Sequence, residues 1–177
     1  RSPSSELKFI ELVIPEKERE YAFKRFIMHY SGMYDELIGN IYDGVLDMLE
    51  KLWTQEQKVG IVTGKSKEAW DITKRKSHFG KFDVVITGND VNNYKPYPEG
   101  INKAIQHLGV QPDEVLYVGD SIVDQQTAQA AGVKHAASLW SKSNDEIEEF
   151  KQKIRENGTD LFLQKPMDIF EIPELKK

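Results

Sequence analysis

Two aspartates, Asp120 and Asp124, follow a short apolar run at residues 115–118. If that run is a strand that leads into a helix, both carboxylates lie at the strand's carboxyl end, where open α/β sheets hold ligands. Adjacent carboxylates repel each other unless a cation or a shared proton lies between them. Mg2+ suits such a pair, because it takes oxygen ligands and keeps waters beside a phosphate. The pair therefore indicates Mg2+-assisted phosphate chemistry; the structural alternative is that Asp120 caps the helix and Asp124 is exposed.

A second candidate site lies where the apolar run at residues 58–63 ends in Thr63 and Gly64. A threonine hydroxyl and the backbone N–H groups at a helix entrance can bind a phosphate oxygen. Threonine followed by glycine is also typical of an ordinary turn, so the pair alone leaves both interpretations open.

The third candidate is Lys95, which Pro96 and Pro98 follow closely. Two prolines stiffen the loop, so the ammonium group is held in one direction. A lysine held beside a phosphate can neutralise the charge that develops on a phosphoryl group. The alternative is a solvated loop lysine with no role in chemistry.

The elements that must position these residues alternate along the chain. Short apolar runs predict strands at residues 58–63, 82–87, 114–118, 134–139 and 160–163. Helical patterns predict helices at residues 44–55, 67–77, 98–108, 122–131 and 145–156, with Ser143 or Asn144 as the last N-cap and Gly158 as its stop. Strands that are apolar throughout are typical of buried parallel sheets. The alternation predicts an α/β fold with a Rossmann-like, doubly wound parallel sheet.

The first 40 residues follow a different pattern. Residues 15–33 predict a helix rich in aromatic side chains, namely Tyr21, Phe23, Phe26 and Tyr30. We interpret residues 1–40 as a helical piece outside the sheet and residues 41–177 as the α/β core. The alternative is an ordinary helix packed on the sheet.

Composition excludes several classes of function. The net charge of -5 and the scattered lysines and arginines argue against a nucleic-acid partner. The absence of cysteine excludes disulfides, thiol catalysis and thiolate zinc sites. No apolar run approaches the roughly 18 residues of a membrane helix. We therefore expect a cytoplasmic protein with no membrane partner, and the oligomeric state stays open.

The three candidate sites, in this order, resemble the haloacid dehalogenase superfamily, in particular its phosphoglycolate-phosphatase-like branch with a small helical cap. Thr63 matches the Thr or Ser that ends the strand of the family's second motif. Residues 95–98 match the Lys-Pro-x-Pro of its third motif. Residues 119–132 match Gly-Asp-Ser, a further Asp and an Ala-rich helix ending in Ala-Gly. The resemblance covers residues 15–172, and it makes residues 1–40 the remnant of a cap.

The resemblance implies a role for each candidate residue. Thr63 and the Gly64 N–H would bind phosphoryl oxygens, and Lys95 would bridge the phosphate and the nucleophile. Asp120 would be an Mg2+ ligand, with Asp124 as a second ligand, directly or through water. The implied reaction is hydrolysis of a small phosphate monoester, a phosphorylated metabolite, through an aspartyl-phosphate intermediate.

Three alternatives to that reaction stay open at this point. Two are enzymatic: phosphoryl transfer like that of β-phosphoglucomutase, and hydrolysis of pyrophosphate. The third belongs to another class, a non-catalytic relative that keeps the fold and acts as a binding or regulatory protein.

One motif of the superfamily is missing. Its Asp-x-Asp-x-Thr supplies the nucleophile and the general acid/base, and only residues 42–47 echo part of it. No apolar strand precedes that stretch, which begins a helix, so we reject it. We expect the first strand and the nucleophile to lie on a native N-terminal segment outside this sequence. The 177 residues alone would then be inactive, and strands beside the missing one would lack backbone partners.

Overall fold

The computed structural model describes residues 5–37 and 41–173. The strands are β1 (Gly60–Val62), β2 (Val84–Ile86), β3 (Leu116–Gly119), β4 (Lys134–Ser138) and β5 (Phe162–Leu163). The helices are α1 (Glu6–Val13), α2 (Glu16–Leu37), α3 (Val45–Thr54), α4 (Lys67–Lys76), α5 (Glu99–Leu108), α6 (Ile122–Ala131) and α7 (Asn144–Glu156). Short 3-10 helices are η1 (Gly88–Asp90), η2 (Pro112–Glu114) and η3 (Pro166–Glu171). The predicted α/β class and the order of the elements are confirmed.

All strand pairs in the described part of the chain are parallel, but they form two sheets. β1 pairs with β2, and β4 lies between β3 and β5. The sequence predicted one sheet. The difference arises because backbone hydrogen bonds join only strands about 4.8 Å apart, and no strand among residues 5–37 and 41–173 links the two sheets.

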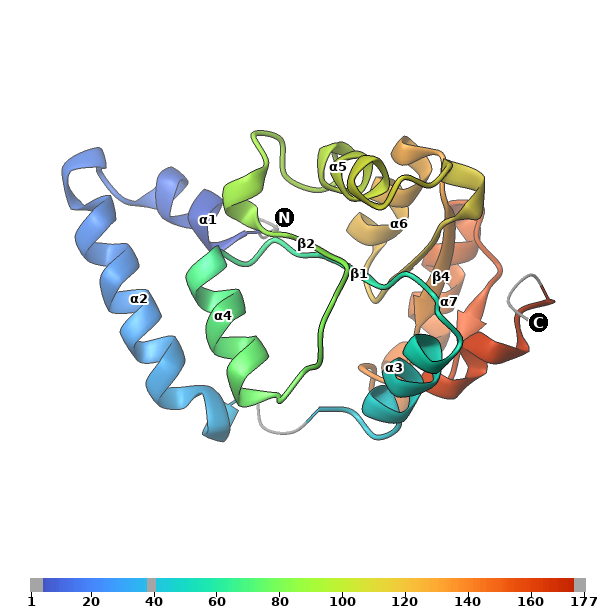
Figure 1. The fold of residues 1–177 in the computed structure, drawn as a ribbon. Coiled ribbons are helices and arrows are strands. Elements are labelled where there is room, and N and C mark those ends of the chain that lie inside the picture. The colour runs from blue at the N-terminus through green and yellow to red at the C-terminus, as the bar shows by residue number, and fades with distance from the viewer. Residues whose placement is uncertain (1–4, 38–40, 174–177) are drawn as a thin grey trace.

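Helices cover both faces of the β1–β2 sheet, as a doubly wound fold requires. Val84 and Ile86 pack with Ala104 of α5. Val85, between them, faces the other way and packs with the cluster that contains Trp70 of α4. Figure 1 shows α5 and α6 on one side of the strands, with α3 and α4 on the other.

The second sheet is also covered on both faces. Ala136 of β4 packs with Ile169 of η3 on one face. On the opposite face Tyr117 of β3 packs with Ala128 of α6. The residue of β4 that lies in register with Tyr117 is His135. Partner residues of parallel strands share a face, so α6 covers both Tyr117 and His135.

The N-terminal helices lie beside α4, as Figure 1 shows for α2. The Tyr30 and Tyr34 hydroxyls of α2 lie 2.8 Å from the Thr73 and Ser77 hydroxyls of α4's carboxyl end. The predicted aromatic helix is therefore confirmed, although it runs from Glu16 to Leu37. Residues 1–4, 38–40 and 174–177 of the predicted cap and core lie outside the described residues, and the division into two domains stays a prediction.

Helix ends follow the predicted capping in part. Ser143 caps α7 with a capping box, and Gly158 follows its end with φ of 87°. The N-cap of α6 is Ser121, whose hydroxyl accepts from the Asp124 N–H. The alternative interpretation, in which Asp120 caps this helix, is therefore wrong. No helix in residues 5–37 or 41–173 has the length and apolar character that crossing a bilayer demands.

Candidate active site

The candidate residues follow three strands at their carboxyl ends: Thr63 follows β1, Lys95 lies in the loop after β2, and Asp120 follows β3. The structure joins two of these segments directly. Lys95 Nζ lies 2.7 Å from Asp124 Oδ1, with the two side chains only 20% and 8% exposed. A loop from the first sheet thus meets a helix from the second in a partly buried ion pair.

Asp124 accepts hydrogen bonds on both of its oxygens. Oδ1 accepts from Lys95 and, at 3.2 Å, from the Tyr117 hydroxyl, while Oδ2 accepts from Ser121 Oγ at 2.5 Å. Burial alone would raise the pKa of Asp124. The charge and hydrogen bond of Lys95, with those from Ser121 and Tyr117, outweigh burial and hold the pKa below its usual value. Asp124 is therefore an ionised carboxylate in its pair with Lys95, and the alternative that it is exposed is wrong.

Gly119 allows this close packing of strand and helix. A Cβ at position 119 would lie 2.4 Å from Asp124 Cβ and 2.7 Å from its Cγ. Separations under 3.0 Å force something to shift. Only glycine lets the end of β3 approach the Asp124 side chain this closely.

Asp120 has a different environment from Asp124. Its side chain is 52% exposed, and Oδ2 accepts from Ser141 Oγ at 3.0 Å and lies 3.7 Å from Lys142 Nζ. An ion pair this long, with the carboxylate half exposed, contributes little to stability. Asp120 therefore keeps a carboxylate open to a ligand.

The two aspartates were predicted to share a metal ion. They supply the hard oxygen donors that Mg2+ takes, and Asp120 is accessible. Within the described ranges, no group of three or more His, Cys, Asp or Glu side chains is placed to hold a metal. The oxygen donors fit Mg2+: the Asp120 carboxylate is open to a ligand, whereas Asp124 is already bonded to protein donors.

Thr63 and Gly64 lead into the amino end of α4. Thr63 Oγ1 accepts from the Lys65 N–H at 3.2 Å, and Ser66 caps the helix. Lys65 Nζ donates to the Tyr30 hydroxyl of α2 at 2.9 Å, and the Ser66 N–H donates to Glu6 at 2.5 Å. This segment therefore contacts α1 and α2 as well as the core.

Tyr117, Ser121 and His135 also belong to this region, although none of them was predicted as a site residue. Tyr117 lies two residues before Gly119, so strand alternation could have placed it on the α6 face. His135 is buried, and neither of its ring nitrogens has a hydrogen-bond partner. Burial lowers the pKa of His135 to about 4, although the charge of Asp124 opposes the shift, so its ring is neutral at pH 7.

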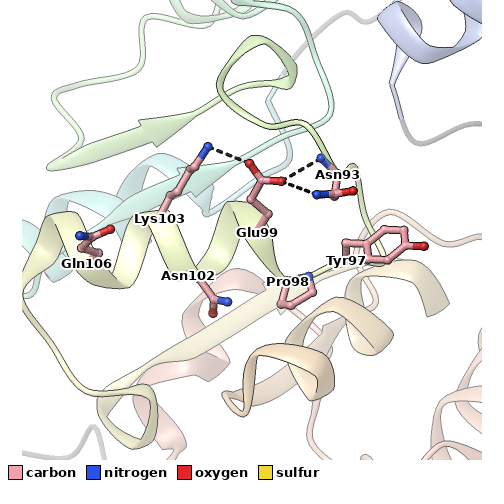
Figure 2. Close-up of a pocket in the computed structure, with 7 residues that line it drawn as sticks. All are labelled: Asn93, Tyr97, Pro98, Glu99, Asn102, Lys103 and Gln106. Carbon is pink, nitrogen blue, oxygen red and sulfur yellow. Dashed lines mark hydrogen bonds and ion pairs between the residues drawn. The ribbon is translucent and has the colours of Figure 1, made fainter.

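A pocket lies near the loop that carries Lys95, and Figure 2 shows its lining. Its residues are Asn93, Tyr97, Pro98, Glu99, Asn102, Lys103 and Gln106. None of the five predicted site residues lines it. Glu99 was also missed by the sequence analysis, and its contacts with the loop are visible in Figure 2.

Comparison with known proteins identifies the family of the chain. The family model described as haloacid dehalogenase-like hydrolase matches residues 3–138. A relative named pyrophosphatase PpaX, from Bacillus cereus (strain AH820), is 38% identical over 141 residues, which are 78% of this chain and 62% of the relative. The chain thus spans less than two thirds of that relative's length.

Solved structures show the same likeness. A candidate phosphoglycolate phosphatase from Lactobacillus plantarum gives a TM-score of 0.72 at 27% identity, covering 91% of this chain and 73% of that one. A HAD-superfamily hydrolase from Geobacter sulfurreducens PCA gives 0.58 at 26% identity, covering 75% and 60%. With Thr63, Lys95 and the two aspartates placed after parallel strands, these matches show that the chain belongs to the haloacid dehalogenase-like hydrolase family.

Proposed function

We propose that the protein containing this chain is an Mg2+-dependent phosphatase that hydrolyses a small phosphate monoester through an aspartyl-phosphate intermediate. The observation that carries the proposal is the partly buried Lys95–Asp124 pair, 2.7 Å apart, which brings the loop after β2 onto the helix after β3. A lysine held so firmly can stabilise negative charge at a defined point without reorganising during the reaction.

Each residue has a role that follows from its position. Lys95 lowers the repulsion between an anionic nucleophile and the phosphate, because it places a positive charge between them. The Thr63 hydroxyl and the Gly64 N–H, which precede α4, bind phosphoryl oxygens. Asp124 holds Lys95 in place.

Mg2+ would be held by Asp120, with Asp124 as a second ligand, directly or through water. When bound, the ion would neutralise negative charge on the phosphoryl oxygens. The exposed Asp120 carboxylate supports this assignment, because it can reach a ligand without breaking a buried contact.

The proposal needs a nucleophilic aspartate that the motifs of these 177 residues do not supply. We propose that it lies on a strand outside the sequence, between the two sheets. This placement is supported by the pairing of β1 with β2 alone and of β3 with β4 alone in the described part of the chain. The 177 residues by themselves are then expected to hydrolyse nothing.

The test is phosphate release by the full-length protein, assayed with 2-phosphoglycolate, a sugar phosphate and pyrophosphate, with and without Mg2+. Lys95→Ala and Asp120→Asn are each expected to lower kcat/KM by at least about 100-fold. The matched control is Asp71→Ala, which removes an exposed pair with Lys67 on α4. Phosphate release that survives Lys95→Ala would refute the assigned role of this lysine.

Pyrophosphate hydrolysis is the second candidate, because the relatives that match at 37–38% identity over 141 residues are named pyrophosphatases. A kcat/KM for pyrophosphate well above that for both monoesters would favour it. Isomerisation of the sugar phosphate without phosphate release would indicate a mutase. Mg2+ binding without turnover of any substrate would indicate the non-catalytic alternative.

A further inference from the structure

Glu99 ties together the base of the loop whose tip carries Lys95. Its Oε1 accepts from the Asn92 N–H at 3.1 Å, and its Oε2 accepts from the Asn93 N–H at 2.8 Å and from the Asn93 side chain at 3.0 Å. Glu99 is the first residue of α5, so these hydrogen bonds join the start of the loop to the residue at which the loop ends. Figure 2 shows the carboxylate directed at Asn93.

Lys103 completes the attachment one helical turn further on. Its Nζ lies 2.8 Å from Glu99 Oε1 and donates to the Asp90 carbonyl at 2.6 Å. Asp90 ends η1, just before the loop, so Lys103 joins both ends of the loop. The hydrogen bond from Lys103, followed by those from the Asn92 and Asn93 N–H groups, lowers the pKa of Glu99 to about 2. Glu99 is therefore ionised throughout the neutral range.

The loop is thus held at two points. Glu99 holds its base, and the contact of Lys95 with Asp124 holds its tip. Between them Pro96 and Pro98 restrict the backbone, and the Tyr97 N–H closes a turn on the Tyr94 carbonyl at 3.1 Å. Because this segment of the loop is short and stiff, the position of the backbone at Asn92 and Asn93 determines the position of Lys95.

We propose that Glu99 is a positioning residue for Lys95: by fixing the backbone at Asn92 and Asn93, it determines where the Lys95 ammonium lies relative to Asp124 and the phosphate. Glu99 touches no reacting group in this assignment and acts through the loop. The link from Glu99 to Lys95 stands on the geometry alone, whereas its effect on catalysis rests on the proposed function.

The first test needs no activity. Brief acetylation of the full-length protein with acetic anhydride, followed by peptide mass spectrometry, gives the reaction rate of Lys95 relative to Lys17, which is 82% exposed. Glu99→Ala is expected to raise the Lys95 rate by about tenfold, because the freed loop leaves Asp124 more often. Glu99→Gln is expected to raise the rate by less, since its amide oxygen can still accept from one backbone N–H group whereas its amide nitrogen cannot accept from the other.

The matched control for acetylation is Asp71→Ala, which breaks an exposed i,i+4 lysine pair on α4, with Nζ and oxygen 2.6 Å apart. It is expected to leave the Lys95 rate unchanged. An unchanged Lys95 rate in Glu99→Ala, in a variant that unfolds at the same urea concentration as the parent, overturns the inference.

The second test is kinetic. Glu99→Ala is expected to lower kcat/KM for the best substrate by about 10- to 100-fold, mostly through kcat. In a Lys95→Ala background the same change is expected to have little further effect, because the residue being positioned is already gone. A full additional loss in that background indicates a general structural role and overturns the inference. If the parent protein releases no phosphate while acetylation behaves as expected, the proposed function fails and the positioning of Lys95 stands.

Discussion

The two carboxylates of one short motif, Asp120 and Asp124, occupy regions of opposite character. The Asp124 side chain is 8% exposed and accepts hydrogen bonds from a lysine, a tyrosine and a serine. Asp120 is half exposed and meets Ser141 and Lys142 at the surface. We call the surroundings of Asp124, with Lys95, Tyr117, Ser121 and His135, the held region, and those of Asp120, with Ser141 and Lys142, the open region.

The difference shows which side chains of the site have their positions fixed by folding, before a ligand binds. Apart from the ring nitrogens of His135, the polar groups of the held region have exchanged water for protein partners, so their positions are set before any ligand binds. The open region keeps groups that can still exchange water for a phosphate or a metal. The following variants test whether the two regions differ in their contribution to stability.

The largest effect is expected for Asp124→Ala, which removes the partner of the partly buried Lys95 ammonium. Loss of one member of such an ion pair removes the charge that compensates the other, so the free energy of unfolding is expected to fall by about 3–5 kcal/mol. Asp120→Ala, in the open region, is expected to change it by less than about 0.5 kcal/mol. Urea denaturation of both variants measures the difference. Equal losses of unfolding free energy would contradict the distinction between the held and open regions.

The second effect is a pH dependence from His135. Its pKa is about 4 in the folded protein and about 6.5 when unfolded, so the unfolded chain binds more protons and stability falls as the pH drops from 6.5 to 4. The loss is expected to reach about 3 kcal/mol. Asp124, whose pKa is also lowered, adds its own loss only below about pH 4.

Urea denaturation between pH 7.5 and 4.5 measures the dependence on His135. The variant His135→Leu is expected to flatten the curve, whereas His107→Gln, at an exposed position of α5, is expected to leave it unchanged. A curve that stays equally steep in His135→Leu assigns the pH dependence to other groups.

A third effect is expected for Gly119→Ala, because the new methyl group collides with the Asp124 side chain. Overpacking of this kind is expected to lower stability by about 1–3 kcal/mol. Gly32→Ala is the matched control: position 32 lies in α2 with no atom within 4 Å of an added Cβ, and the change is expected to stabilise by about 0.5–1 kcal/mol. Thermal unfolding of both variants checks the signs.

The smallest effect is expected for Tyr117→Phe. Burial first, and then the nearby Asp124, raise the pKa of Tyr117, so its hydroxyl stays protonated and donates to that carboxylate. Loss of this bond is expected to lower stability by about 1 kcal/mol. Tyr42→Phe, at a side chain 52% exposed, is expected to have no measurable effect in the same urea series.

The elements could be predicted from the sequence because each depends on local pattern. Short apolar runs and capping residues such as Ser143 are visible within a few positions. The pairing of the strands in two sheets depends on partners distant in sequence, so the pattern of each run could not show it.

The site could be predicted only in part for the same reason. Lys95, Asp120 and Asp124 were found because of their neighbours in sequence. Their unequal burial depends on Tyr117 and on the loop 29 residues before Asp124, which spacing alone cannot place. The contacts from Glu99 back to Asn92 and Asn93 likewise appear only once the loop is folded.

The attachment of α1 and α2 has a consequence for the order of folding. These helices reach the core through contacts that span long stretches of chain: Glu6 to Ser66, Tyr30 to Thr73, and Tyr34 to Ser77. α1 contributes no buried residue of its own to offset the entropy of closing such loops. We therefore expect both helices to dock after α4 has formed, so that their amides gain protection last in a pulse-labelled refolding experiment.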